Sequence, residues 1–418
     1  MNNAKKVHTE TRRHGEITNE VKQILNSIPN LIKRTFPIPS KFQSSLPKDI
    51  AELSGLLTNN RGKRSLSYLA RPNYLSAYLY YFLPWNLYRL CLLLPNLNIT
   101  LSSGDEITDI GCGPLTFISA LWITRPDLRK IKLEINCVDR SAPALEAGKK
   151  FFEALSGAEN NWKINLIKED INFIKPIRSA LLKRKKANLV SAVNIFNEVY
   201  ESLPFNNSEG LKQIAANAAA FLNNEALQNA GILTVEPGVP QSGKFISFLR
   251  DALIKLNRLP ASPCTHTAAC PLSVRPLAGG QSKVIRGRNW IDTKKRWCHF
   301  AFETFDAPHD LRRLSAAAKL PKDRLVLSFL LTQNSKGDKK EQLAAEISDA
   351  RVISDAFPLP QNKFGRYGCS NQGLILITGE KSRMENLHSL SLVPKNKLTE
   401  FSADNYDKKS GALKKEIK

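Results

Sequence analysis

Residues 107–117 read ITDIGCGPLTF, and this stretch decides the fold class. An apolar run ends at Asp109 and Ile110, a Gly-x-Gly turn follows, and a helical pattern begins near Thr116. Glycine is needed where a backbone passes close to a ligand with no Cβ in the way. The stretch therefore predicts a strand, a ligand-binding turn and a helix, with Asp109, Gly111, Gly113 and Pro114 as candidate cofactor-binding residues.

Two further acidic residues follow the next two apolar runs. INCVDRS (135–141) brings Asp139 to a strand end, where a carboxylate can accept hydrogen bonds from two ribose hydroxyls. KEDINF (168–173) places Asp170 where it can reach an adenine edge. The D-x-G-x-G pattern favours S-adenosylmethionine over a dinucleotide, whereas an ordinary strand-to-helix turn is the simpler alternative. A third glycine is common two residues after Gly113, but Leu115 stands there.

Short apolar runs separated by helical patterns follow from residue 105 onward, and the alternation of the first five with helical segments indicates βαβ units and a parallel sheet. The runs are Ile107–Ile110, Leu133–Val138, Ile164–Ile167, Leu189–Val193, Ile232–Val235, Leu325–Leu331 and Leu374–Ile377. Residues 237–324 form a stretch rich in Pro, Cys, Arg and Lys that is too long for a simple connection, so we expect it to carry function.

The first hundred residues predict helices. Ile17, Val21, Ile24, Leu25 and Ile28 share one face of a helix over 16–34. A second helical stretch over 65–94 is rich in aromatics that could stack on bases, but their helical spacing favours a core. Residues 395–418 are polar and Lys-rich, which predicts a flexible tail.

The fourth run continues as NIFNEV (194–199). Amino-methyltransferases often place Asn or Asp here, followed by Pro-Pro and an aromatic, to orient the attacking nitrogen. This chain has no Pro-Pro and no cysteine nucleophile on the strand. Asn194, a candidate cofactor-binding residue, Asn197 and Glu198 could bind a substrate or could serve as structural polar contacts, and catalytic residues stay unknown.

The chain is strongly basic, with 61 Lys and Arg against 38 acidic residues and a net charge of +23. Such a balance favours a polyanionic partner, for which we predict nucleic acid, although a merely basic enzyme is the alternative. Residues 241–300 hold eleven Lys or Arg and two acids. We expect the RNA-binding residues there, and the candidates are Arg286, Arg288, Lys294, Lys295 and Arg296.

No secretory signal is visible, and Tyr74–Pro95 is interrupted by Pro84, Asn86 and Arg89, so we expect no membrane span. Seven cysteines in 418 residues do not form a disulfide scaffold. The predicted location is a reducing compartment, a bacterial cytoplasm, with the mitochondrial matrix as the alternative. We expect a monomer.

Four of the seven cysteines lie outside apolar strands. They are Cys264 and Cys270 in SPCTHTAACPL, Cys298 in KRWCHFAF and Cys369 in RYGCSNQGL. No C-x-x-C pair is present, which counts against an ordinary zinc ribbon. A cubane iron–sulfur cluster takes four thiolates that need not be close in sequence. His266 and His299 are possible substitute ligands, and four unrelated reduced thiols are the simpler alternative.

TDIGCGP, VNIFNEV, VEPGVP, PCTHTAACPL and WCHF occur in this order and resemble the methyltransferase-like small-ribosomal-subunit proteins of mitochondria and their bacterial relatives. The resemblance covers about residues 50–380. It implies a class I S-adenosylmethionine-dependent methyltransferase-like Rossmann fold (α/β) with a seven-stranded core and a cysteine-bearing insertion after strand five, to which the sequence adds an N-terminal helical region. It also implies a [4Fe–4S] cluster on Cys264, Cys270, Cys298 and Cys369, and a role in small-subunit maturation.

The expected parts are a helical region (1–100), the Rossmann core (101–236), a basic cysteine-bearing insertion (237–324), the final core strands with the fourth cysteine (325–385) and a basic flexible tail (386–418). Three functions are open. The first is a ribosomal-RNA-binding assembly factor of the small subunit that acts in ribosome biogenesis and translation. The second is an active S-adenosylmethionine-dependent rRNA methyltransferase. The third is a zinc-stabilised RNA-binding protein without cofactor.

Overall fold

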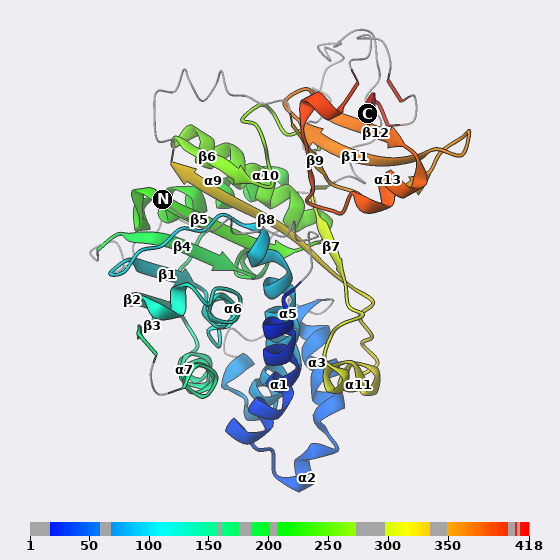
Figure 1. Ribbon diagram of the computed structural model, residues 1–418. Helices are drawn as coiled ribbons and strands as arrows, with labels where there is room; N and C mark the ends of the chain where they lie inside the picture. Colours follow the sequence, from blue (N-terminus) through cyan, green and yellow to red (C-terminus); the bar gives the residue numbers. More distant parts are fainter. Residues whose placement is uncertain are drawn as a thin grey trace, which may run out of the picture.

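The computed structural model describes residues 17–58, 68–157, 160–174, 185–200, 207–272, 297–334, 349–399, 406–407 and 410–417. In these ranges the chain forms an eight-stranded sheet flanked by helices and a separate six-stranded sheet (Figure 1).

The main sheet has the order β3-β2-β1-β4-β5-β8-β6, with β7 also paired to β8. Its strands are β1 (Glu106–Ile110), β2 (Leu133–Asp139), β3 (Trp162–Lys168), β4 (Ala187–Val193), β5 (Ala226–Pro237), β6 (Arg258–Ser262), β7 (Phe300–Glu303) and β8 (Arg324–Asn334). The first five are parallel, and β8 runs antiparallel to β5, β6 and β7. The predicted α/β sheet is confirmed, with its first five apolar runs as parallel strands, and the sixth run forms the antiparallel β8. The sheet has eight strands instead of the expected seven, because both β6 and β7 pair with β8.

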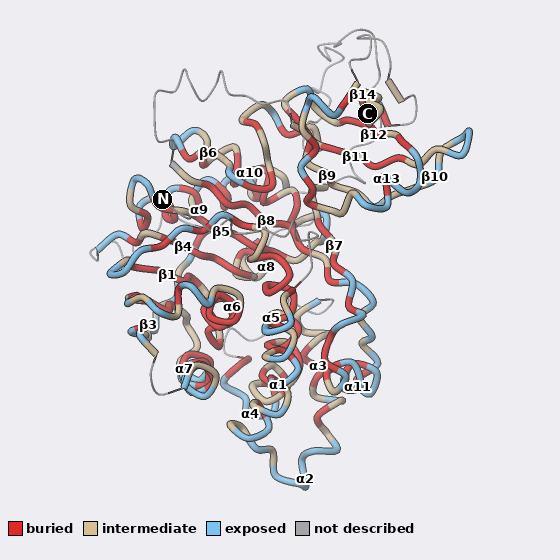
Figure 2. Tube along the Cα trace, viewed as in Figure 1, coloured by how far each residue is buried: buried red, intermediate tan, exposed pale blue. Residues whose placement is uncertain are grey.

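Helices cover both faces of this sheet, which is why all five residues of β1 are buried (Figure 2). One core lies between the sheet, the N-terminal helices, α6 (Thr116–Thr124) and α7 (Ala142–Ser156). The other lies between the opposite face, α9 (Ser208–Glu225) and α10 (Pro240–Lys255). The short helix α8 (Phe196–Tyr200) follows β4.

The N-terminal region is helical, as expected. It comprises α1 (Asn19–Thr35), α2 (Ser40–Gln43), α3 (Leu46–Leu57), α4 (Pro72–Ala77), a π-helical turn (Tyr78–Phe82) and α5 (Leu83–Leu93), with 3-10 turns at Tyr68–Ala70 and Leu94–Asn96. Val21, Leu25 and Ile28 are buried on one face of α1. Most of the aromatics over 65–94 lie in the core, as their spacing predicts. No described helix is long and apolar enough to span a membrane.

The edge of the main sheet beyond β8 is made by two strands with a break between them. β6 ends at Ser262 opposite Leu331, and β7 begins at Phe300 opposite Leu327. The chain therefore leaves this edge after β6 and returns to it at β7. The stretch 237–324 holds three of the four candidate cysteines, and it also contains α10, β6, β7 and α11 (His309–Ala317).

The second sheet has the order β13-β9-β11-β12-β14, with β10 paired to β11. Its strands are β9 (Ala350–Val352), β10 (Phe357–Pro358), β11 (Phe364–Ser370), β12 (Gly373–Gly379), β13 (Leu392–Val393) and β14 (Leu413–Glu416). The helix α13 (Lys381–Asn386) and a 3-10 turn (Lys395–Lys397) complete this part. It has its own small core.

Two expectations about the C-terminal part are wrong. Leu374–Ile377 is a strand, but it lies in the second sheet and not among the final strands of the core. The described residues of the expected tail are ordered, because Val393 and Leu398 join the small core and β14 pairs with β12. The many Lys residues of the tail conceal this apolar pattern in the sequence.

Candidate functional site

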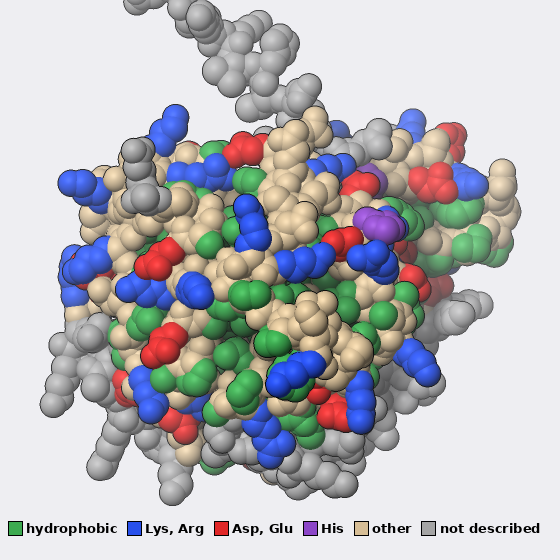
Figure 3. All heavy atoms as spheres, turned by 90° about the horizontal axis from the view of Figure 1, so that it is seen from below, with side chains coloured by type: hydrophobic (Ala, Val, Ile, Leu, Met, Phe, Trp, Pro, Cys, Tyr) green, Lys and Arg blue, Asp and Glu red, His purple; other side chains and the backbone are tan. Residues whose placement is uncertain are grey.

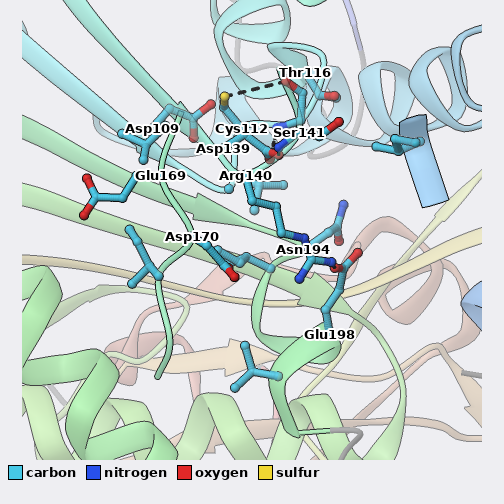
Figure 4. A pocket seen from close by; sticks show the side chains of 18 of the residues that line it. Asp109, Cys112, Thr116, Asp139, Arg140, Ser141, Glu169, Asp170, Asn194 and Glu198 are labelled. Carbon is cyan, nitrogen blue, oxygen red and sulfur yellow. Dashed lines mark hydrogen bonds and ion pairs between the residues drawn. The ribbon is translucent and has the colours of Figure 1, made fainter. Parts of the chain in front are cut away.

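A cavity of about 360 Å³ lies at the carboxyl ends of β1, β2 and β4 (Figure 4). This is the point where the strand order reverses, because β2 and β4 flank β1 on opposite sides. Ligands of open α/β sheets bind at such switch points. Asp109, Gly111, Gly113, Asp139, Asp170 and Asn194 all line the cavity, so the structure brings six of the seven predicted cofactor-binding residues together.

Pro114 is the exception, because it packs against α7 instead of lining the cavity. The glycines beside it have backbone reasons to be glycine. Gly111 has φ +65° and a Cβ there would lie 2.4 Å from Ile195 Cδ1. Leu115, where a third glycine is common, adopts the left-handed conformation with φ 55° and is fully buried. The turn thus keeps the glycine-like backbone without the glycine.

The three acidic residues differ in environment. Asp109 is buried, accepts a 2.7 Å hydrogen bond from Ser191 Oγ, and its Oδ2 has no partner among the described residues. Asp139 accepts backbone N–H groups of Gly113 (2.9 Å) and Ser141 (2.8 Å), so it ties the turn to β2. Burial raises the pKa of both carboxyl groups, that of Asp109 to about 7. Asp170 is exposed at the rim.

Asn194 lies at the end of β4 with φ 58°, and its Oδ1 accepts a 2.8 Å hydrogen bond from the buried Arg89 of α5. Glu236, at the end of β5, accepts the backbone N–H groups of Phe196 (2.9 Å) and Asn197 (3.0 Å). Burial raises the pKa of Glu236 to about 8. Glu236 therefore caps α8 and holds the loop that presents Asn194.

A bridge joins opposite sides of the cavity. Arg140 donates a 2.8 Å hydrogen bond to Glu198 Oε2, and Tyr68 donates one of 3.2 Å to Oε1. All three residues line the cavity. Of these three residues, the sequence suggests a ligand-binding role only for Glu198. It assigns Tyr68 to the hydrophobic core. The position of Arg140 next to Asp139 was the sequence signal that could have identified Arg140 as a cavity residue. Its partner Glu198 lies 58 residues away in the chain, so the sequence does not reveal the pair.

The four candidate metal-ligating cysteines lie at the break in the sheet edge. Cys264 is two residues after β6 and Cys298 is two residues before β7. Cys270 follows in the loop after Cys264, and Cys369 comes from β11 of the second sheet. Burial, and then the nearby Cys264, Cys270 and Cys369, raise the pKa of the Cys298 thiol. Residues far apart in sequence are thus gathered where the two sheets meet.

Contacts on either side hold this junction. Arg351 of β9 donates a 2.9 Å hydrogen bond to the carbonyl of Pro263, and Thr265 donates one of 3.1 Å to the carbonyl of Asp349. His266 Nε2 lies 3.4 Å from Cys369 Sγ, whereas His299 stacks on Trp297. His266 is therefore the predicted substitute ligand whose ring nitrogen contacts a candidate thiol, whereas the ring of His299, which follows Cys298, contacts Trp297.

Among the described residues, no group of three or more His, Cys, Asp or Glu side chains is arranged to hold a metal ion. Burial raises the pKa of the Cys264 thiol to about 11 and those of Cys298 and Cys369 well above the ordinary value. The remaining cysteines (Cys91, Cys112 and Cys137) are buried. The candidate RNA-binding residues Arg286, Arg288, Lys294, Lys295 and Arg296 lie outside the described residues.

The strand order, the antiparallel β8 between β5 and β6, and the glycine turn at the switch point define a class I methyltransferase-like α/β protein. The family model of the mitochondrial small ribosomal subunit protein Rsm22 matches residues 103–354. The chain belongs to this family.

Two solved methyltransferase structures show a distant similarity to the chain. The plantazolicin methyltransferase BpumL in complex with SAH is 15% identical over 75% of this chain and 98% of its own, with a TM-score of 0.27. A SAM-dependent methyltransferase from Geobacter sulfurreducens with S-adenosyl-L-homocysteine is 11% identical over 60% and 91%, with a TM-score of 0.30. No curated protein sequence matches the chain.

Proposed function

We propose that the chain is an assembly factor of the small ribosomal subunit that binds ribosomal RNA, holds S-adenosylmethionine in the cavity and carries a [4Fe–4S] cluster on its four cysteines. The description of the family names the mitochondrial small ribosomal subunit, and this supports a role in the assembly of that subunit. The observation that carries the proposal is the convergence of four thiols, from three separate segments, on the junction of the two sheets.

The cavity residues fit S-adenosylmethionine. Asp109 offers a buried oxygen that has no partner in the part of the chain that the structure describes, which suits the ammonium group of the methionine part. Gly111 and Gly113 give the turn a backbone that no side chain obstructs. Asp139 is held by two backbone N–H groups and keeps lone pairs free for ribose hydroxyls. When bound, the cofactor supplies a transferable methyl group.

Four cysteine thiols are a ligand set that suits a cubane cluster. In a [4Fe–4S] cluster each thiolate binds a different iron, and the ligands need not be close in sequence. The absence of a C-x-x-C pair counts against an ordinary zinc ribbon. The cysteines Cys264, Cys270, Cys298 and Cys369 would be the ligands. A bound cluster would cross-link the two sheets at this junction.

The arrangement around Asn194 favours binding over methyl transfer. A carboxamide that orients an attacking nitrogen accepts its hydrogen bond through Oδ1. Here Oδ1 of Asn194 accepts a hydrogen bond from the buried Arg89, so one of its two lone pairs is engaged. The target nitrogen of an active rRNA methyltransferase would have to share this oxygen with Arg89. The zinc-stabilised alternative differs in metal content, which the experiment below measures.

The RNA-binding part of the proposal rests on the charge of the chain. The face formed by the N-terminal helices carries Lys and Arg interspersed with Asp and Glu (Figure 3), including the pairs Lys22–Asp306 and Lys33–Asp310. We therefore place the RNA contact in the basic stretch 275–296, between Cys270 and Cys298. The chain would work where the small subunit is assembled, which for the mitochondrial proteins of the family is the matrix.

The test is co-sedimentation of the full chain, purified without oxygen, with precursors of the small ribosomal subunit. We expect wild type to co-sediment, to be brown and to contain roughly four irons and four acid-labile sulfides per chain. Cys264→Ser and Cys270→Ser should lose the colour and bind the precursors less. Stoichiometric zinc with no acid-labile sulfide would reject the cluster and favour the zinc-stabilised alternative. Wild-type protein that stays at the top of the gradient would contradict the assembly role.

A further inference from the structure

Arg250 is an arginine in the middle of α10 whose side chain is 2% exposed. Its Nη2 donates hydrogen bonds to the carbonyl oxygens of His266 (2.7 Å) and Ala268 (2.8 Å). Both carbonyls belong to the loop between Cys264 and Cys270. The guanidinium thus holds the loop that carries two of the four cysteines.

The charge of Arg250 also converges on the thiols. The guanidinium lies within electrostatic reach of the side chains of all four cysteines. Among the described residues its ion pair is with Asp251, a carboxylate that is 46% exposed and so only weakly offsets a buried cation. A buried guanidinium is costly unless hydrogen-bond acceptors and negative charge surround it.

We infer that Arg250 is a positioning residue of the four-cysteine site, which orients the Cys264–Cys270 loop and offsets the negative charge that four thiolates bring to a bound cluster. This inference rests on the proposed cluster. Arg250 lies outside the sequence motifs, within the regular helical pattern of α10, so the sequence does not identify it as part of the cysteine site.

Arg258 of β6 provides a matched control. It is buried too, and it donates to the carbonyl oxygens of Ala226, Leu227, Gln228 and Ala230. No described cysteine is among its partners, because it lies at the opposite end of β6 from the break. Losing Arg258 therefore removes a buried guanidinium and its carbonyl contacts without touching the cysteines.

The experiment compares R250Q, R250K, R258Q and R258K as full chains purified without oxygen. Iron and sulfide content, the rate of iron loss to a chelator, the midpoint potential and the melting temperature are measured for each. Loss of an outer-shell partner typically weakens metal binding about 10–100-fold. We expect R250Q to lose iron at least about 10-fold faster than wild type. Its potential should be more negative, because a positive charge near the cluster is gone.

R250K separates the two roles. Lysine keeps the charge but lacks the planar fork that reaches two carbonyls, so we expect a potential near that of wild type and faster iron loss. R258Q and R258K should lower the melting temperature but leave iron loss and potential as in wild type. If R250Q does not fold, faster iron loss from R250K than from R258K supports the inference.

Equal iron content, iron loss and potential in the Arg250 variants and wild type would overturn the inference. Equal iron loss from R250K and R258K would do so as well. A wild-type protein that contains no acid-labile sulfide is a different result, because it removes the cluster itself and with it that part of the proposed function.

Discussion

Ser191 and Asp109 form a hydrogen bond of 2.7 Å that occupies one oxygen of a buried carboxylate and leaves the other, Oδ2, without a partner among the described residues. The two residues lie opposite each other on neighbouring strands β4 and β1. Burial is the main cause that raises the pKa of Asp109 to about 7. A cationic ligand group beside Oδ2 would reverse this effect, because it favours the ionised form.

The affinity for S-adenosylmethionine should therefore depend on pH. Without ligand, Asp109 is protonated below its pKa of about 7, and the ammonium group of the ligand must displace that proton. We expect affinity to rise from about pH 5 to about pH 7 and then to level off, with proton release on binding. Calorimetry in buffers of different ionisation enthalpy measures both quantities.

D109N is the control for this pH dependence. Asparagine cannot ionise, so binding should be weaker and flat over the same range. The same substitution affects stability with a definite sign. Because the folded-state pKa is raised, the contribution of Asp109 is most favourable below its unfolded pKa and is lost as pH rises toward about 7. An unchanged pH profile of binding in D109N would show that another group titrates.

Gly148→Ala should disturb the cofactor site without touching a ligand. A Cβ at Gly148 would lie 2.5 Å from the carbonyl carbon of Pro114, and backbone cannot easily move aside. Alanine normally stabilises a helix interior by about 1 kcal/mol relative to glycine. Here overpacking should reverse the sign and cost about 1–3 kcal/mol. Thermal unfolding and S-adenosylmethionine calorimetry check this, with Glu146→Ala on the exposed face of α7 as control. A higher melting temperature for Gly148→Ala would contradict the close packing.

Glu198→Gln should speed the exchange of a ligand in the cavity. The ion pair between Arg140 and Glu198 spans the cavity, and both side chains are about three-quarters buried, at 25% and 23% exposure. Such a partly screened pair is worth roughly 1 kcal/mol, so its loss should raise association and dissociation rates roughly fivefold. Rapid-mixing binding kinetics measure the rates, and Glu153→Gln, which breaks the exposed pair with Lys149, is the control. Equal rates in Glu198→Gln and wild type would show that the bridge does not limit entry.

Cys369→Ser should loosen the second sheet as well as bleach the protein. Cys369 is the candidate ligand contributed by that sheet, so without it a cluster cannot cross-link the two sheets. We expect faster amide hydrogen exchange over residues 349–399 and little change in β1 and β2. Cys91→Ser removes a buried thiol of α5 far from the junction and should keep the colour. Unaltered exchange in colourless Cys369→Ser would mean that other contacts suffice to dock the sheet.

Charge reversal of Arg286, Arg288, Lys294, Lys295 and Arg296 should weaken RNA binding and flatten its salt dependence. Each lost phosphate contact lowers the log–log salt slope by about one unit. Binding of small-subunit RNA measured over a range of salt concentrations gives the slope. Charge reversal of Lys22 and Lys33, which already pair with carboxylates, provides the comparison. A slope equal to that of wild type would place the RNA contact elsewhere.

The sequence by itself determined the Rossmann-like half of the protein. Neighbouring residues specify the strand, the glycine turn and the helix at residues 107–117. Local sequence also specifies the alternating apolar runs that form the parallel sheet. For the same reason six predicted cofactor-binding residues share one cavity. The carboxyl ends of parallel strands must meet at one edge, so the strand assignment alone brings these residues together.

The tertiary structure decided the rest, because the deciding contacts join residues far apart in the chain. Three such contacts have no periodic pattern in the sequence. They are the ion pair of Arg140 with Glu198, the hydrogen bond from Arg89 to Asn194 and the hydrogen bond from Arg250 to the cysteine loop. The strand at Leu374–Ile377 has the same local pattern in either sheet. Only the pairing of β11 and β12 with each other, and not with β8, assigns it to the second sheet.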